Sequence, residues 1–96
     1  MDIQKALRAV VATGKIYMGA AQAEKAIKGG KAKLIIVANN SPEKAEIVKS
    51  AKGKQVPVHE FSGMGTELGP ACGKPFAVGI LTVLDAGESD ILQLAR

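Results

Sequence analysis

The sequence predicts an α/β fold, a three-layer α/β/α sandwich in which helices cover both faces of a four-stranded mixed sheet. The 96 residues fit one compact domain, because domains usually contain about 50 to 250 residues. Segments with the apolar spacing of helices alternate along the chain with short apolar runs typical of strands. Residues 33–38 form an almost continuous apolar run, as expected for a central strand that is covered on both faces.

The first half of the chain contains two predicted helices separated by a short strand. Apolar residues recur at helical spacing over residues 3–11, and a Thr-Gly pair ends this helix. Residues 16–18 form an apolar strand bounded by glycines. An alanine-rich helix follows at residues 20–28 and stops at two glycines.

The second half contains the remaining helices and strands. Ser41 is a good N-cap residue and Pro42 suits the first helical position, so a third helix is expected to begin there. Residues 56–61 alternate in polarity, but Pro57 cannot donate to a strand ladder, which predicts an edge strand. The remaining predicted elements are a short helix at residues 66–72, a last strand at residues 77–84, and a helical turn at residues 89–94 that packs Ile91, Leu92 and Leu94 on the core.

The basic charge is concentrated in one part of the sequence. Residues 1–54 contain eleven Lys and Arg and four Asp and Glu, which gives a net charge of +7. Residues 55–96 contain two basic and five acidic residues, which gives a net charge of −3. A basic region attracts polyanions and favours nucleic acid as a partner. The alternative is that these lysines are only a solvated surface that keeps the protein soluble.

Several protein classes are excluded by composition. A single cysteine, Cys72, cannot form an internal disulfide or share a structural zinc with a second cysteine. No apolar run approaches the roughly 20 residues of a transmembrane helix, and the first residues lack the apolar core of a signal peptide. We therefore expect a cytoplasmic protein that does not bind membranes.

Catalytic and metal chemistry have little support in the residues. His59 is the one histidine, and the spacing of its sequence neighbours does not identify a nucleophile that it could activate. Cys72 has no sequence neighbour that would lower the pKa of its thiol. The acidic residues Asp85, Glu88 and Asp90 lack the ligand set of a calcium loop and are interpreted as a solvated turn. We expect no enzyme activity, no metal and no cofactor.

A nucleotide site is an alternative at the glycine-rich residues 63–69. These glycines lie between a predicted strand and a predicted helix, as in phosphate-binding loops. Three residues separate Gly65 from Gly69, whereas the dinucleotide fingerprint requires two at that point. The sequence also lacks a GxxxxGK[ST] motif.

RNA binding requires free amide groups, cations, and an apolar surface for an unstacked base. The helix after Gly19 has free N–H groups at its N-terminus that point out of the helix, and the helix dipole favours an anion there. Asn39 and Asn40 leave the central strand and either meet base edges or only shape the turn. Phe76 either stacks on a base or belongs to the core.

Five sequence blocks occur in order along the chain: TGKIxMG at residues 13–19, GKAKLIIVANN at 30–40, ELG at 67–69, GKPFxVG at 73–79 and AGESDIL at 86–92. Together they resemble ribosomal protein thirty of the archaeal and eukaryotic large subunit, a family of the kink-turn RNA-binding superfamily. The resemblance spans nearly the whole chain. It implies that residues 1–96 form a single RNA-binding α/β/α domain and a non-catalytic part of the large ribosomal subunit.

The resemblance also implies where RNA binds: the second helix N-terminus, the loop after the central strand and the loop before the last strand. The candidate RNA-binding residues are Lys15, Gly19, Ala20, Ala21, Gln22, Lys25, Lys28, Asn39, Asn40, Gly73, Lys74, Phe76, Ala77 and Val78. With Lys31 and Lys33, the lysines are expected to neutralise phosphates at the same end of the sandwich as the free amides. Phe76 with Val78 is expected to cover an exposed base.

One departure bears on the RNA that is bound. Superfamily members that bind tandem G·A pairs tightly carry G-x-N-E-x-x-K at the second helix, where this chain keeps Gly19 and Lys25 but has Ala21 and Gln22. Neither replacement accepts from guanine as a carboxylate would. The resemblance therefore implies weaker binding of an isolated kink-turn.

The expected partners are ribosomal RNA and neighbouring ribosomal proteins, with a monomer outside the ribosome. Two other hypotheses stay open beside the nucleotide site. One is a kink-turn-binding protein of a non-ribosomal ribonucleoprotein. The other is a module that binds only proteins and uses its lysines for solvation.

Overall fold

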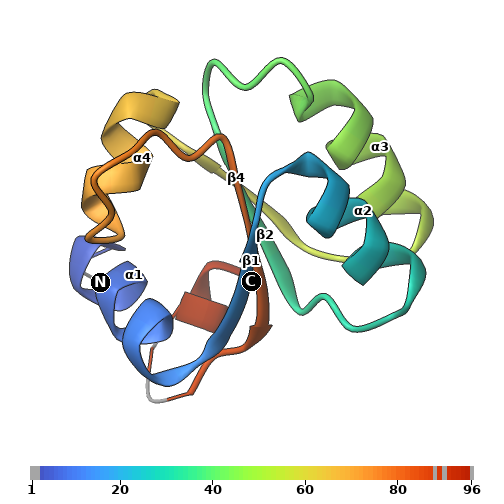
Figure 1. The fold of residues 1–96 in the computed structure, drawn as a ribbon. Coiled ribbons are helices and arrows are strands. Elements are labelled where there is room, and N and C mark those ends of the chain that lie inside the picture. Colours follow the sequence, from blue (N-terminus) through green and yellow to red (C-terminus); the bar gives the residue numbers. More distant parts are fainter. Residues whose placement is uncertain (1–2, 88, 90, 96) are drawn as a thin grey trace.

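The computed structural model describes residues 3–87, 89 and 91–95, and it has the predicted α/β/α architecture (Figure 1). The elements are α1 (Ile3–Thr13), β1 (Lys15–Met18), α2 (Ala20–Lys28), β2 (Leu34–Ala38), α3 (Lys44–Gly53), β3 (Val58–Phe61), α4 (Gly65–Ala71), β4 (Ile80–Asp85) and the 3-10 helix η1 (Ile91–Ala95). No described helix is long and apolar enough to cross a membrane.

The four strands form one mixed sheet in the order β1-β4-β2-β3. β2 and β3 are parallel, whereas β4 lies antiparallel to both β1 and β2. β1, β2 and β3 therefore run in the same direction, and β1 and β3 are the two edges. The edge position of β3 confirms the prediction made from Pro57, which directly precedes the strand.

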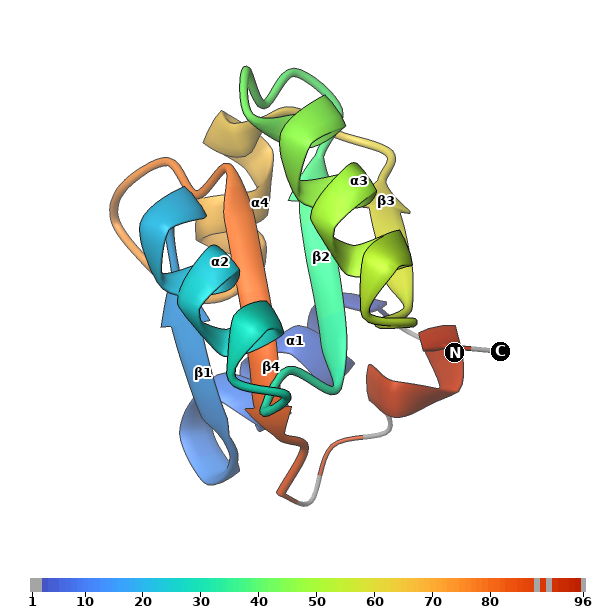
Figure 2. The same ribbon diagram turned by 90° about the vertical axis from the view of Figure 1, so that its right-hand side faces the viewer.

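Two apolar cores lie on opposite faces of the sheet. α1 and α4 cover one face and α2 and α3 cover the other, as the two ribbon views show (Figures 1 and 2). Alternate residues of the fully buried β2 supply both cores: Leu34 and Ile36 face α1, and Ile35 and Val37 face α2 and α3. The central strand is thus buried on both sides, as its continuous apolar sequence predicted.

The third helix begins later than predicted. Ser41 does not cap it: the Ser41 hydroxyl donates to the Glu43 carboxylate at 3.3 Å, and the Lys44 N–H donates to the Ser41 carbonyl at 3.2 Å. These bonds form a turn, so the α-helix starts at Lys44 with Glu43 at its N-cap.

The last strand also begins later than predicted. The Val78 N–H donates to the Gly65 carbonyl at 3.0 Å, and this bond ties Val78 to α4 rather than to the sheet. β4 therefore starts at Ile80.

At the C-terminal end, Ile91 is fully buried as predicted, but Leu92 is 36% exposed and does not pack on the core. The Ser89 hydroxyl donates to the Ala6 carbonyl and fastens this segment to α1. The side chain of Leu94, together with Glu88 and Asp90, lies outside the described residues.

Candidate nucleic-acid interface

The segments that follow β1, β2 and β3 meet at one end of the sheet, because these three strands run in the same direction. The segment that precedes the antiparallel β4 reaches the same end. We call this surface the loop end and define it by residues 19–22, 39–43, 62–64 and 73–79. It lies at the top of Figure 1.

Backbone hydrogen bonds join the segments of the loop end to one another. The N–H groups of Gly19, Ala38 and Asn39 donate to the carbonyls of Ile80, Gly79 and Gly63 at 3.0, 2.8 and 2.9 Å. The Gly65 N–H donates to Asn40 Oδ1 at 2.9 Å. The loops are thus held in fixed positions by the sheet and by each other.

The N-terminus of α2 presents unbonded amides at this end. Gly19 is its N-cap with φ of +100°, and no side chain caps the helix. The first helical bond runs from the Ala23 N–H to the Gly19 carbonyl at 3.1 Å, so the N–H groups of Ala20, Ala21 and Gln22 have no intrahelical acceptor. A Cβ at Gly19 would meet nothing within 4 Å, which leaves this helix end open to an anion.

Asn39 and Asn40 are both exposed at the loop end, but Asn40 also has a structural role. Its carboxamide oxygen accepts from Gly65 and fixes the loop to the start of α4. The Asn40 NH₂ group and the whole Asn39 carboxamide remain at the surface as polar groups of the kind that bind base edges.

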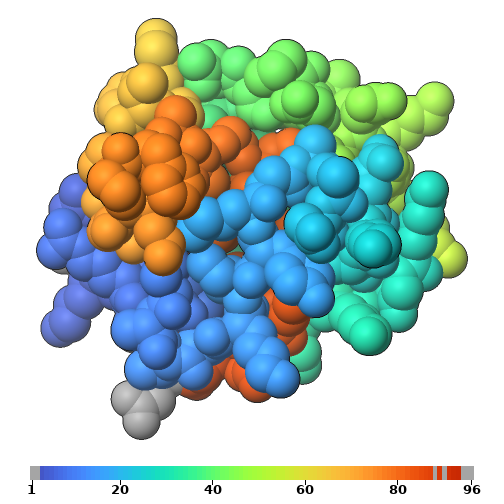
Figure 3. Space-filling view, in the orientation of Figure 1, coloured from blue at the N-terminus to red at the C-terminus, as the bar shows by residue number. Residues whose placement is uncertain are grey.

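Phe76 is 53% exposed, so the alternative that its ring belongs to the core is wrong. Its loop, orange in Figure 3, lies against the start of α2, in blue. Gly73 and Ala77 are exposed and Lys74 is half-buried. Val78 is 3% exposed and packs in the core beneath the loop, so its side chain is not available to cover a base as predicted.

Met64 is a further apolar surface of the loop end that the sequence did not reveal. It is 54% exposed and lies directly before α4. A methionine within a turn cluster was the available signal, but a turn position alone does not predict exposure.

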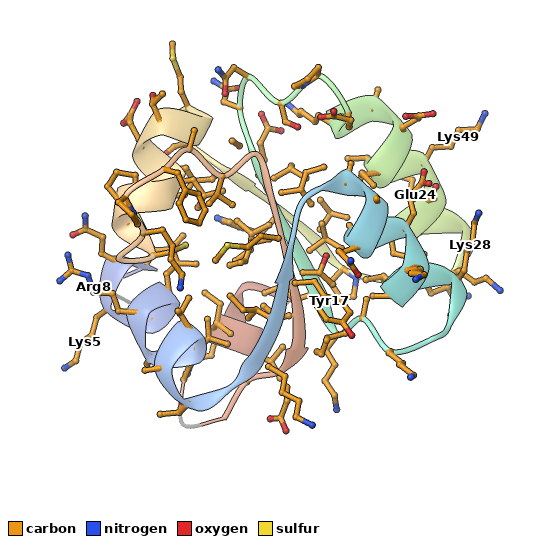
Figure 4. The ribbon with its side chains drawn as sticks, in the orientation of Figure 1. Lys5, Arg8, Tyr17, Glu24, Lys28 and Lys49 are labelled. Carbon is orange, nitrogen blue, oxygen red and sulfur yellow. The ribbon has the colours of Figure 1, made fainter. Side chains whose placement is uncertain are left out.

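Most of the candidate lysines do not lie at the loop end, which corrects the prediction that lysines and free amides share one end. Lys15 begins β1 and Lys33 directly precedes β2, so both lie at the end of the sheet from which these strands start. Lys31 is next to Lys33, and Lys28 extends from the far end of α2 (Figure 4). Lys25 lies on the exposed surface of α2, between the two ends.

The glycine-rich residues 63–69 are not arranged as a phosphate-binding loop. The Gly65 N–H is bonded to Asn40, and the N–H groups of Glu67 and Leu68 both donate to the Met64 carbonyl at 2.9 Å. A Cβ at Gly69 would lie 1.7 Å from the Phe76 carbonyl oxygen. Gly65 and Gly69 therefore allow close packing of α4 against the Phe76 loop.

Among the residues that the structure describes, the reactive side chains form no catalytic cluster. Cys72 is buried, and burial raises the pKa of its thiol despite the opposing effect of Lys74, so the thiol stays protonated at neutral pH. His59 is half-buried on the edge strand β3. Within the described ranges, no three His, Cys, Asp or Glu side chains come together to hold a metal ion.

Comparisons with known proteins match almost the entire chain. The model of the "Ribosomal protein L7Ae/L30e/S12e/Gadd45 family" matches residues 1–93. The "Large ribosomal subunit protein eL30" of Methanosarcina mazei is 45% identical over 92 residues, which cover 96% of this chain and 87% of the relative. The protein of the same name from Methanosphaera stadtmanae is 43% identical over 96 residues, which cover 98% of both chains.

The fold is also found in a solved structure. A protein with unknown function from Bacillus halodurans has a TM-score of 0.84 and covers 98% of this chain and 95% of its own. Its sequence identity is 24%, so it shows a shared fold alone.

Proposed function

Because the chain belongs to the ribosomal protein L7Ae/L30e/S12e/Gadd45 family, we propose that it is a structural component of the large ribosomal subunit that binds ribosomal RNA through its loop end. Its relatives that carry the name of a large-subunit protein match it over nearly their whole length. In this role the protein is cytoplasmic and ribosome-associated, binds neighbouring ribosomal proteins, and catalyses no reaction. Outside the ribosome it is a monomer.

The observation that carries this proposal is the fixed grouping of three RNA-binding features at one end of the sheet. The unbonded amides at the start of α2 suit a phosphate, the exposed carboxamide of Asn39 suits a base edge, and the Phe76 ring suits a base face. A straight duplex does not offer an unstacked base beside a phosphate. A kink-turn or an internal loop does, and we propose that RNA of this kind is bound.

Gln22 sets the strength of this interaction. It is exposed in the first turn of α2, where a carboxylate would accept charge-assisted hydrogen bonds from guanine but an amide accepts weaker ones. We therefore propose that an isolated tandem G·A kink-turn is bound weakly and that ribosomal RNA supplies further contacts.

The proposal is tested by cross-linking the intact protein to RNA in its own cells and sequencing the RNA that is recovered. We expect fragments of large-subunit ribosomal RNA that contain an internal loop or a kink-turn. Recovery of a different small RNA would favour a non-ribosomal ribonucleoprotein instead. Recovery of no RNA above a control without cross-linking would overturn the proposal.

Phe76→Ala tests the loop end directly. Removing a stacked ring is expected to cost about 1–3 kcal/mol of binding free energy, roughly a fivefold to 150-fold loss of affinity, for the recovered RNA fragment. Stability should change little because the ring is 53% exposed. Filter binding and thermal unfolding measure the two effects.

Leu92→Ala is the matched control, because Leu92 is also an exposed apolar residue but lies on η1, away from the loop end (Figure 2). Its RNA affinity should equal that of the native chain. Equal RNA affinities of the native chain, Phe76→Ala and Leu92→Ala would show that the Phe76 ring does not contact the RNA.

A further inference from the structure

A basic groove runs along α2 from the loop end toward the opposite end of the sheet. Two adjoining hollows of about 450 and 220 Å³ share Tyr17 and Lys31. Together they are lined by Tyr17 and by four lysines, Lys15, Lys25, Lys31 and Lys33. We call this surface the Tyr17 groove.

The groove follows from the position of β1 at the sheet edge. Along this strand Ile16 and Met18 pack on the α1 core, so Lys15 and Tyr17 point to the α2 face. α2 covers that face only as far as Lys28, and the chain then turns away at Gly29 and Gly30. The Tyr17 ring is left 42% exposed on the α2 side of β1 (Figure 4).

The charge of the groove is strongly positive. None of its four lysines takes part in an ion pair within the part of the chain that the structure describes. The single carboxylate of its lining is Asp85, whose Oδ1 accepts a hydrogen bond from the Gly87 N–H at 2.9 Å. Four cations against one carboxylate make the groove attractive to a polyanion.

The aromatic ring indicates which polyanion fits. An exposed tyrosine between lysines offers a stacking surface for a base while the cations bind the phosphates on either side. The acidic residues of a peptide would use the lysines but have no aromatic group to stack on the ring, whereas every nucleotide carries both a phosphate and a base. The chemistry of the groove therefore favours a single-stranded nucleic acid.

We propose that the Tyr17 groove binds a single-stranded RNA segment, with one base stacked on Tyr17 and the phosphates held by the surrounding lysines. Gln22 and Lys25 line the part of the groove next to the loop end, so one RNA molecule can occupy both surfaces. The segment is then a single-stranded extension of the RNA that binds the loop end. In this respect the inference rests on the proposed function.

The first experiment observes Tyr17 itself. The chain contains one tyrosine and no tryptophan, so the ring signals of tyrosine in an NMR spectrum belong to Tyr17 alone. Titration of the full chain with a short single-stranded oligoribonucleotide should move these signals upfield, because a stacked base shields the ring. An unmoved tyrosine signal would overturn the proposal. A shift produced by poly-glutamate but not by RNA would assign the groove to an acidic protein and would equally overturn it.

The second experiment compares an internal-loop RNA with and without a single-stranded extension. The extension should increase affinity for the native chain and make the salt dependence steeper. The double variant Lys31→Ala/Lys33→Ala should lose this gain, with a slope of log K against log[salt] that is shallower by about 1.4, since about 0.7 counterions are released per phosphate of a single strand. Its affinity for the unextended RNA should stay native.

The matched control is Lys49→Ala/Lys52→Ala, which removes the same charge from exposed positions of α3. This control should keep the full gain from the extension. If both double variants lose the gain equally, only net charge matters and the groove is not a site.

The outcomes separate this proposal from the proposed function. If the unextended RNA binds but the extension adds nothing and Tyr17 does not respond, the groove proposal fails and the loop-end function stands. If the unextended RNA does not bind but the single strand shifts Tyr17, the groove is supported and the loop-end function fails.

Discussion

Thr82 carries a buried hydroxyl on the interior strand β4, and this hydroxyl has no hydrogen-bond partner within the described part of the chain. Leaving such a group unpaired costs free energy that an apolar side chain of the same shape avoids. Thr82→Val is therefore expected to raise the free energy of unfolding by about 1 kcal/mol, measured by urea denaturation followed by circular dichroism. A loss of stability would show that the hydroxyl is bonded in solution.

The two phenylalanines show what sequence reasoning can decide at a single residue. Each lies at the boundary of a predicted strand, yet Phe61 is 9% exposed and Phe76 is 53% exposed. The difference comes from tertiary packing. Phe61 ends the paired strand β3 and packs in the core that α4 covers, whereas Phe76 lies in a loop whose backbone packs on the outside of α4 at Gly69. The local sequence pattern therefore could not decide whether Phe76 is buried. It also wrongly predicted a surface role for Val78, which is buried.

At the scale of elements, the contact between α4 and the Phe76 loop positions the candidate site. A Cβ at Gly69 would lie 1.7 Å from the Phe76 carbonyl oxygen, so Gly69→Ala must push the loop away from α4. We expect a loss of about 1–3 kcal/mol in the free energy of unfolding and a lower affinity for RNA. Thermal unfolding and filter binding measure the two losses.

Gly53→Ala is the control for this substitution. Gly53 is the last residue of α3, and a Cβ there would meet nothing within 4 Å. The variant should be as stable as the native chain or slightly more stable, because alanine restricts the unfolded chain. The account of α4 packing is wrong if Gly69→Ala behaves in the same way.

Boundaries of the elements were predictable where local residues set them. α2 begins after Gly19 and ends before Gly29, and both glycines are visible in the sequence. The start of β4 was not predictable, because it depends on the bond from Val78 to Gly65, which are distant in sequence. The apolar residues 77 and 78 predicted an earlier start of this strand, but the N–H of Val78 is bonded to α4 instead of to a neighbouring strand.

At the scale of the whole molecule, strand direction decides where the charged and polar groups lie. Residues that precede β1 and β2 lie at one end of the sheet and residues that follow them lie at the other. The lysines at positions 15 and 33 are therefore separated from Gly19 and Asn39. The sequence showed the basic half of the chain, but its distribution over two ends required the sheet topology.

NMR mapping of backbone amides, with an internal-loop fragment of large-subunit ribosomal RNA added to the protein, shows whether RNA contacts the loop end. We expect the largest changes at residues 20–22, 39–40, 73–74 and 76–77, with further changes along the Tyr17 groove when the RNA has a single-stranded extension. Changes confined to α1 or α3, with the amides at the start of α2 unmoved, would contradict RNA contact at the loop end.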